Sequence, residues 1–124
     1  MENLNIEATK YTPKINLDLN GTLSLVGKSS PENTFEFYKP MIEWVNGYFD
    51  SNPADKTVVN MEIIYFNSSS SKLFFDFFDI LDEKKADYNI EINWIYDEEN
   101  ETAEEAGEDF IEDFEELTIN LVTK

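Results

Sequence analysis

The sequence contains no cysteine and no histidine. Without cysteine the chain can form neither a disulfide nor a thiolate metal site, and no thiol nucleophile is available. Without histidine it lacks the usual general base near neutral pH and the commonest metal ligand. These absences weigh against catalysis, and we expect neither a cofactor nor a resident metal ion.

Long hydrophobic runs are missing as well. No apolar segment approaches the roughly 18 residues that a membrane-spanning helix needs. The first residues, MENLNIEATKYTP, lack the basic stretch and apolar centre of a secretory signal. We therefore expect a cytoplasmic protein.

Positive charge is scarce. Nine lysine and arginine residues stand against 27 aspartate and glutamate residues, which gives a formal net charge of −18. This charge opposes nucleic acid and anionic membranes as partners, but it is compatible with a basic protein surface. Solubility, or adaptation to a salty cytoplasm, explains the charge equally well.

The residues that are present suit one packed domain. The chain has 124 residues, of which 41% are hydrophobic and 15% aromatic. A chain of this length buries roughly two-thirds of its unfolded surface without a covalent staple. We expect a single domain over residues 1–124.

Five segments alternate between apolar and polar residues, as strands with one buried face do. Residues 15–19 and 22–26 flank Asn20-Gly21, a two-residue hairpin signal. The others are residues 58–66, 88–96 and 117–122, and the apolar face of the first of these holds Val59, Met61, Ile63 and Tyr65. Polar residues lie opposite, so we expect an uncovered sheet face that includes Asn60, Glu62, Glu91 and Asn93.

Three helical segments separate these strands. The first begins at Ser30-Pro31 with Ser30 as its N-cap, or near Lys39 if Pro40 breaks the pattern. The second turns Leu73, Phe74, Phe77, Phe78 and Leu81 toward the sheet, and the third spans roughly residues 100–114. The order β-β-α-β-α-β-α-β predicts a two-layer α+β fold, with a mixed sheet of about five strands and helices mainly on one face.

Acidic residues crowd the segment from Asp97 to Glu116. The segment lacks the alternating spacing of a calcium-binding EF-hand loop, so we interpret it as a solvated helix face. A hydrolase or metal-dependent enzyme that uses Asp97 and neighbouring carboxylates is the enzymatic alternative. No nucleophile in the sequence has a candidate base beside it, which disfavours that alternative.

Four consecutive serines lie between a strand and a helix in YFNSSSSKLFFDFFDILDE, residues 65–83. One serine is enough to cap a helix, and Ser68 and Ser69 are the candidates for that role. The free backbone N–H groups and the dipole of a helix N-terminus also favour a phosphate, by roughly 0.3–1 kcal/mol at an exposed position. The serines are therefore either a cap or a phosphorylation site.

Three ordered blocks resemble the SiaC-like regulatory phosphoproteins, small bacterial proteins that govern diguanylate cyclases. They are SSPENTFEFYKPMIEWV, IIYFNSSSSKLFFDFFDIL and WIYDEENETAEEAGEDFIEDF. The resemblance covers most of the chain. It implies a fold like that of the anti-sigma-factor antagonist (STAS) domain and a protein that is not an enzyme.

The resemblance also implies a switch. In the family a dedicated protein kinase phosphorylates the hydroxyl residue directly after the asparagine, and a metal-dependent PP2C-type phosphatase reverses it. The unphosphorylated protein binds and activates a diguanylate cyclase. The phosphoacceptor position is Ser68 here, where the family commonly has threonine, and Ser69 and Ser70 are adjacent alternatives.

Several polar residues are candidates for partner binding beside this switch. Asn67 forms a turn or orients the neighbouring hydroxyl. Asp97 ends the next strand and is expected near Ser68, where it docks a kinase, binds a metal carried by a partner enzyme, or caps the third helix. The remaining candidates, which form a patch or merely cap the first helix, are Glu32, Asn33 and Thr34, together with Ser69.

A second partner class shares the fold and the phosphorylation logic. An antagonist of an anti-sigma factor would use the same serine to switch a different partner. A homodimer is also compatible with the sequence.

Overall fold

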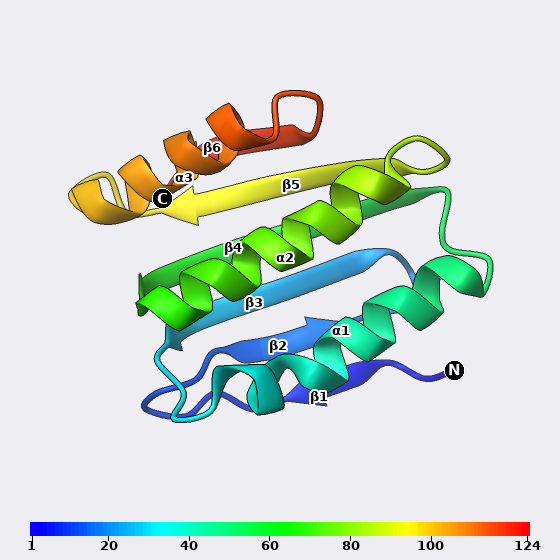
Figure 1. Cartoon of the computed structure of the whole chain (residues 1–124), viewed down its shortest axis with the longest axis horizontal. Coiled ribbons are helices and arrows are strands. Elements are labelled where there is room, and N and C mark those ends of the chain that lie inside the picture. The colour runs from blue at the N-terminus through cyan, green and yellow to red at the C-terminus, as the bar shows by residue number, and fades with distance from the viewer.

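The chain folds into two layers, a six-stranded sheet and three helices that all lie on one face of it (Figure 1). The structure is a computed structural model that describes residues 1–124. The strand order in the sheet follows the chain order from β1 to β6. None of the helices is both long and apolar enough to span a membrane.

The sheet is mixed because its two halves are connected differently. Its strands are β1 (Leu4–Ile6), β2 (Lys14–Leu17), β3 (Thr22–Ser29), β4 (Lys56–Phe66), β5 (Asn89–Tyr96) and β6 (Thr118–Thr123). The first three pair antiparallel, whereas β3 to β6 pair in parallel. Each parallel pair is connected by one helix, namely α1 (Thr34–Asp50), α2 (Ser68–Lys84) or α3 (Glu101–Asp113).

The predicted architecture is confirmed, with one strand more than expected. The sequence predicted a mixed sheet of about five strands with helices mainly on one face, and the five predicted strands are β2 to β6. The additional strand, β1, is only three residues long. Such a short segment cannot show an alternating pattern, so its pairing with β2 is not readable from the sequence.

The predicted start of the first helix is wrong. Helix α1 begins at Thr34, and its N-cap is Asn33, whose side chain accepts a hydrogen bond from the Glu36 backbone N–H at 3.2 Å. Ser30 instead donates its backbone N–H to the Tyr11 carbonyl at 2.8 Å, a contact with a distant loop. The helix then runs through Pro40 without ending.

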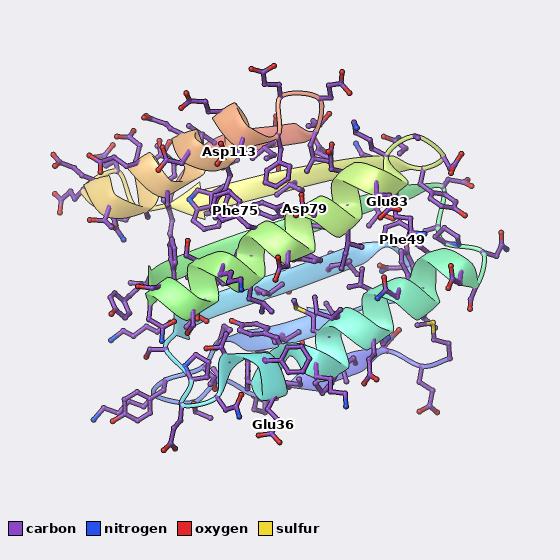
Figure 2. The ribbon with its side chains drawn as sticks, viewed as in Figure 1. Glu36, Phe49, Phe75, Asp79, Glu83 and Asp113 are labelled. Atoms are coloured by element: carbon purple, nitrogen blue, oxygen red, sulfur yellow. The ribbon has the colours of Figure 1, made fainter.

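Twenty-six buried side chains form one core between the sheet and the helices. The apolar stripe of α2 contributes the five predicted residues Leu73, Phe74, Phe77, Phe78 and Leu81, all buried. Phe75 of α2 lies toward α3, where its ring centroid is 5.0 Å from that of Phe110 (Figure 2). Aromatic contacts therefore join the two helices as well as the helices and the sheet.

Helix α3 approaches the sheet closely at Gly107. A Cβ atom at this position would lie 2.6 Å from Cδ1 of the buried Trp94 and 2.5 Å from Cδ2 of Leu121. The Trp94 indole N–H donates to the Ala103 carbonyl of α3 at 2.8 Å. Only a glycine lets the helix backbone sit this near the indole ring, so Gly107 and Trp94 together position α3.

The other face of the sheet carries no helix, and a row of polar side chains crosses it. Successive register partners in the six strands are Asn5, Asn16, Ser24, Asn60, Asn93 and Asn120. The Asn93 amide donates to Asn60 at 2.9 Å, and the Asn120 amide donates to Asn93 at 3.1 Å. The expected uncovered face is therefore confirmed, and Asn60, Glu62, Glu91 and Asn93 are each partly exposed on it.

Two ion pairs flank this polar row. Lys56 lies 3.1 Å from Glu91, and Lys124 lies 2.6 Å from Glu62. The hydrogen bond from Lys56 holds the pKa of Glu91 below its usual value, and the amide of Asn120 acts in the same direction. These pairs keep charges of both signs on the uncovered face.

One strand departs from simple alternation. Strand β4 contains a β-bulge, because Gly27 of β3 pairs with Ile63 and the next residue, Lys28, pairs with Tyr65. Ile64 is therefore the extra residue. The sequence predicted Tyr65 on the core face with Ile63, but Tyr65 is 55% exposed. The prediction was wrong because a bulge shifts the alternation by one residue.

Candidate functional site

Ser68 is the first residue of α2 and is exposed. The carboxyl ends of β3, β4 and β5 lie at one end of the sheet, which is also where the three helices begin (Figure 1). Backbone N–H groups at a helix start have no partner within the helix. Ser68 therefore lies where a phosphate would meet free donors.

Asn67 caps α2, which neither candidate serine does. Its side-chain oxygen accepts from the Ser70 backbone N–H at 2.9 Å and from the Ser69 hydroxyl at 3.2 Å. Its own backbone N–H donates to the Ser29 carbonyl at 3.0 Å, which ties the start of α2 to the end of β3. The capping role considered for Ser68 or Ser69 is thus wrong, and the exposed Ser68 hydroxyl forms none of these bonds.

Ser69 connects two helix starts. Its hydroxyl lies 2.6 Å from the hydroxyl of Thr34, the first residue of α1. Because Ser69 donates to Asn67, Thr34 is the donor in this pair. Of the predicted patch, Thr34 thus reaches the serines, Asn33 caps α1, and Glu32 is exposed in the preceding loop.

Ser70 is fully buried, so a kinase cannot reach its hydroxyl in the folded chain. That hydroxyl donates to the Ser29 carbonyl at 3.0 Å and lies 2.7 Å from the Ser29 hydroxyl, which lies 2.6 Å from the Tyr38 hydroxyl. Each hydroxyl has one proton, so Tyr38 donates to Ser29 and Ser29 donates to Ser70. This chain of hydrogen bonds between the Tyr38, Ser29 and Ser70 hydroxyls connects α1, β3 and α2 near Ser68.

Alkaline unfolding should report on this buried chain. Burial raises the pKa of the Tyr38 phenol from 10.0 to about 12. Between these pH values the unfolded chain loses the phenol proton first, so the stabilising contribution of Tyr38 is present below about pH 10 and falls as pH rises to about 12. The full loss is about 3 kcal/mol in the free energy of unfolding.

The matched control for this prediction is Tyr38→Phe. Lysines and other tyrosines titrate equally in both proteins, so the difference in free energy of unfolding isolates Tyr38. Urea denaturation at several pH values should show the wild type losing about 2 kcal/mol relative to the variant by about pH 11.5. Parallel stability curves would contradict the assignment of a buried neutral phenol.

Asp97 lies beside Ile64, because both residues line one pocket together with Tyr96 and Asn100. The Asp97 carboxylate accepts from the Glu99 backbone N–H at 2.9 Å and forms the turn before α3. It does not cap α3, as the sequence had suggested, because the cap is Asn100.

Asn100 is the residue that the sequence reasoning missed. Its side-chain oxygen accepts from the Ala103 backbone N–H at 3.1 Å, and its amide donates to the Ile64 carbonyl at 3.1 Å. One side chain thus caps α3 and satisfies the carbonyl of the bulge residue. Asparagine at the start of an acidic helical segment is an N-cap signal, but its second contact depends on the bulge.

The acidic segment after Asn100 forms the outer surface of α3. Most of its carboxylates are exposed, Asp113 among them, whereas Glu104 accepts a hydrogen bond from the Tyr96 hydroxyl of β5 at 3.0 Å. No group of three or more carboxylates is arranged to hold a metal ion. The solvated helix face predicted from the sequence describes this surface.

Comparison with known proteins gives consistent matches over almost the whole chain. Residues 6–124 match the model of the SiaC family of regulatory phosphoproteins. An uncharacterized protein of Pseudomonas aeruginosa strain UCBPP-PA14 is 34% identical over 115 residues, which is 91% of this chain and 90% of that protein.

Solved structures agree with the family match. SiaC of Pseudomonas aeruginosa superimposes with a TM-score of 0.89 at 29% identity, over 100% of both chains. A chain from the crystal structure of the diguanylate cyclase SiaD in complex with its activator SiaC, from the same organism, also gives 0.89, at 31% identity over 98% of this chain and 99% of that one.

Proposed function

This chain belongs to the SiaC family of regulatory phosphoproteins, and we propose that it is an adaptor that binds and activates a diguanylate cyclase while Ser68 is unphosphorylated. A protein kinase adds the phosphate and a PP2C-type phosphatase removes it. The protein acts in the cytoplasm and catalyses no reaction itself. Support for the cyclase as partner comes from the related SiaC, which is the activator of the cyclase SiaD.

The observation that carries the proposal is the contrast among the serines. Ser70 is buried and Ser69 is bonded to Thr34 and Asn67, whereas the Ser68 hydroxyl is exposed and outside that network. A kinase can therefore modify Ser68 without breaking an internal contact. Ser68 is also the residue directly after the asparagine, as the family resemblance requires.

The structure can hold a phosphate at Ser68 without unfolding. A phosphate there adds about 1.5 to 2 negative charges at the positive end of α2. Lys72 is exposed one helical turn later, at the spacing at which side chains of one helix meet. The phosphate thus changes the surface that a partner meets and leaves the fold in place.

A cyclase assay tests this function. Adding the unphosphorylated protein to its purified cyclase should raise the rate of cyclic di-GMP formation, and treatment with the kinase and ATP should abolish that increase. Mass spectrometry of the treated protein should find one phosphate, on Ser68. The Ser68→Ala variant should still activate after the same treatment. No activation by the unphosphorylated protein would reject the proposal.

A further inference from the structure

We infer that the β-bulge of β4 presents Ile64 and Tyr65 as the apolar anchor by which this protein binds its cyclase. The inference rests on the proposed function and specifies the contact surface. Ile64 is 56% exposed and Tyr65 is 55% exposed, although both belong to a strand whose other large apolar residues pack inward. Exposed neighbouring apolar side chains of this size mark a binding surface more often than isolated ones do.

The bulge is what turns both side chains outward. Ile63 is buried beneath the helices, and the ring of Phe66 packs against Phe74 of α2 at a centroid distance of 5.6 Å. In an uninterrupted strand, only one residue between two core positions could face away from the helices. The extra residue places Ile64 and Tyr65 in succession on the uncovered side.

Two further residues, Gly27 and Asn100, stabilise the bulge. Gly27, which pairs just before it, has φ of +134°, a conformation that L side chains rarely adopt. Asn100 donates its amide to the Ile64 carbonyl at 3.1 Å, which satisfies a group that the disrupted strand pairing would leave free. The exposed pair is therefore held in a defined position.

The exposed pair Ile64 and Tyr65 is close in the sequence to Ser68, the proposed phosphorylation site. Tyr65 and Ser68 are separated only by Phe66, which faces the core, and Asn67, which caps α2. Val26 of β3, 41% exposed, is a further apolar side chain on the uncovered face, where it pairs with Glu62 of β4. We name Val26, Ile64 and Tyr65 the bulge patch. The bulge patch is on the uncovered face and Ser68 is at the start of α2, so a partner that reaches around this end of the sheet can contact both (Figure 1).

The charge around the bulge patch indicates the chemistry of its occupant. Charges of both signs border the patch, because Asp97 and Lys124 line a pocket with Ile64, whereas Lys28 pairs with Tyr65 and Lys14 with Val26. The matching partner surface has an apolar centre, basic residues facing Asp97 and acidic residues facing Lys14 and Lys28. A second copy of this chain fits poorly, because each copy carries a net charge of −18.

Binding of the purified cyclase to substituted proteins tests the bulge patch. The double variant Ile64→Ala with Tyr65→Ala should bind the cyclase more weakly, with a dissociation constant at least about tenfold higher than that of wild type. Leu19→Ala removes a 39% exposed apolar side chain at the opposite end of the sheet, and should stay within about twofold of wild type. Circular dichroism melting should show that the double variant remains folded.

Asn100→Asp tests the positioning role. Aspartate keeps the oxygen that caps α3 but loses the amide donor to Ile64. It should weaken binding about threefold in the wild-type background and have no effect in the double variant, because the anchor it positions is then absent. An equal loss in both backgrounds would assign Asn100 a role independent of the bulge patch and would overturn that part of the inference.

Phosphorylated wild type separates this inference from the proposed function. If phosphate on Ser68 weakens binding while the double variant binds like wild type, the proposed function stands and the bulge patch is rejected as the anchor. If phosphate on Ser68 has no effect on binding or activation, the proposed function fails. A double variant whose sedimentation mass differs from that of wild type would make a second copy the occupant and would also overturn the inference.

Discussion

Phosphate on Ser68 should weaken binding to the cyclase by roughly 30- to 5,000-fold. The estimate corresponds to about 2–5 kcal/mol, the usual loss when a buried contact between matched polar groups is replaced by an unpaired charge. Ser68→Asp should reproduce part of the loss, since a carboxylate has fewer oxygens and less charge than a phosphate. Isothermal titration of the cyclase with each form at one ionic strength measures the effect.

Ser68→Ala is the matched control for this comparison. It removes a hydroxyl that takes no part in the bonds around Asn67 and Ser69, so its affinity should remain close to that of the unmodified wild type. It should also keep that affinity after incubation with kinase and ATP. Equal affinity for the phosphorylated, Asp and Ala forms would place Ser68 outside the interface.

Trp94→Ala should lower the free energy of unfolding by about 3–5 kcal/mol. The indole is fully buried, its ring centroid lies 5.2 Å from that of Phe110, and its N–H is bonded to the Ala103 carbonyl. Its removal leaves a cavity between β5 and α3 and takes away the side-chain hydrogen bond that joins them. Because the free energy of unfolding of a native protein is typically about 5–15 kcal/mol, this single substitution removes a large part of the stability.

Urea denaturation followed by far-ultraviolet circular dichroism measures this loss. Val122→Ala, which truncates a 37% exposed side chain on β6, should stay within about 0.5 kcal/mol of wild type. Trp94→Phe should fall between the two, because it keeps an aromatic ring but loses the hydrogen bond to α3. A Trp94→Ala protein as stable as wild type would mean that α3 is not anchored through Trp94.

Local patterns were sufficient for most of the fold. Alternation predicted β2 to β6, and helical spacing predicted the core face of α2 and the extent of α3. The start of α1 could not be predicted, because both Ser30 and Asn33 are good caps. The contact that decides between them, from Ser30 to Tyr11, joins segments far apart in the sequence.

The candidate site was predictable in position but not in detail. Ser70 lies three and four residues before Leu73 and Phe74, so helical spacing predicts its burial once the start of α2 is known. The β-bulge could not be predicted, because two consecutive isoleucines, Ile63 and Ile64, are only a minor departure from the alternating pattern of a strand. Its existence depends on Gly27 and Asn100, which lie in other elements.

The order of the strands bears on how the chain folds as it is synthesised. Every strand pairs with the strands immediately before and after it in the sequence, and none is inserted between two earlier strands. The sheet can therefore grow from one edge, each new helix and strand adding to a surface that already exists. A chain emerging from the ribosome can keep its completed part native-like and need not rearrange it when β6 arrives.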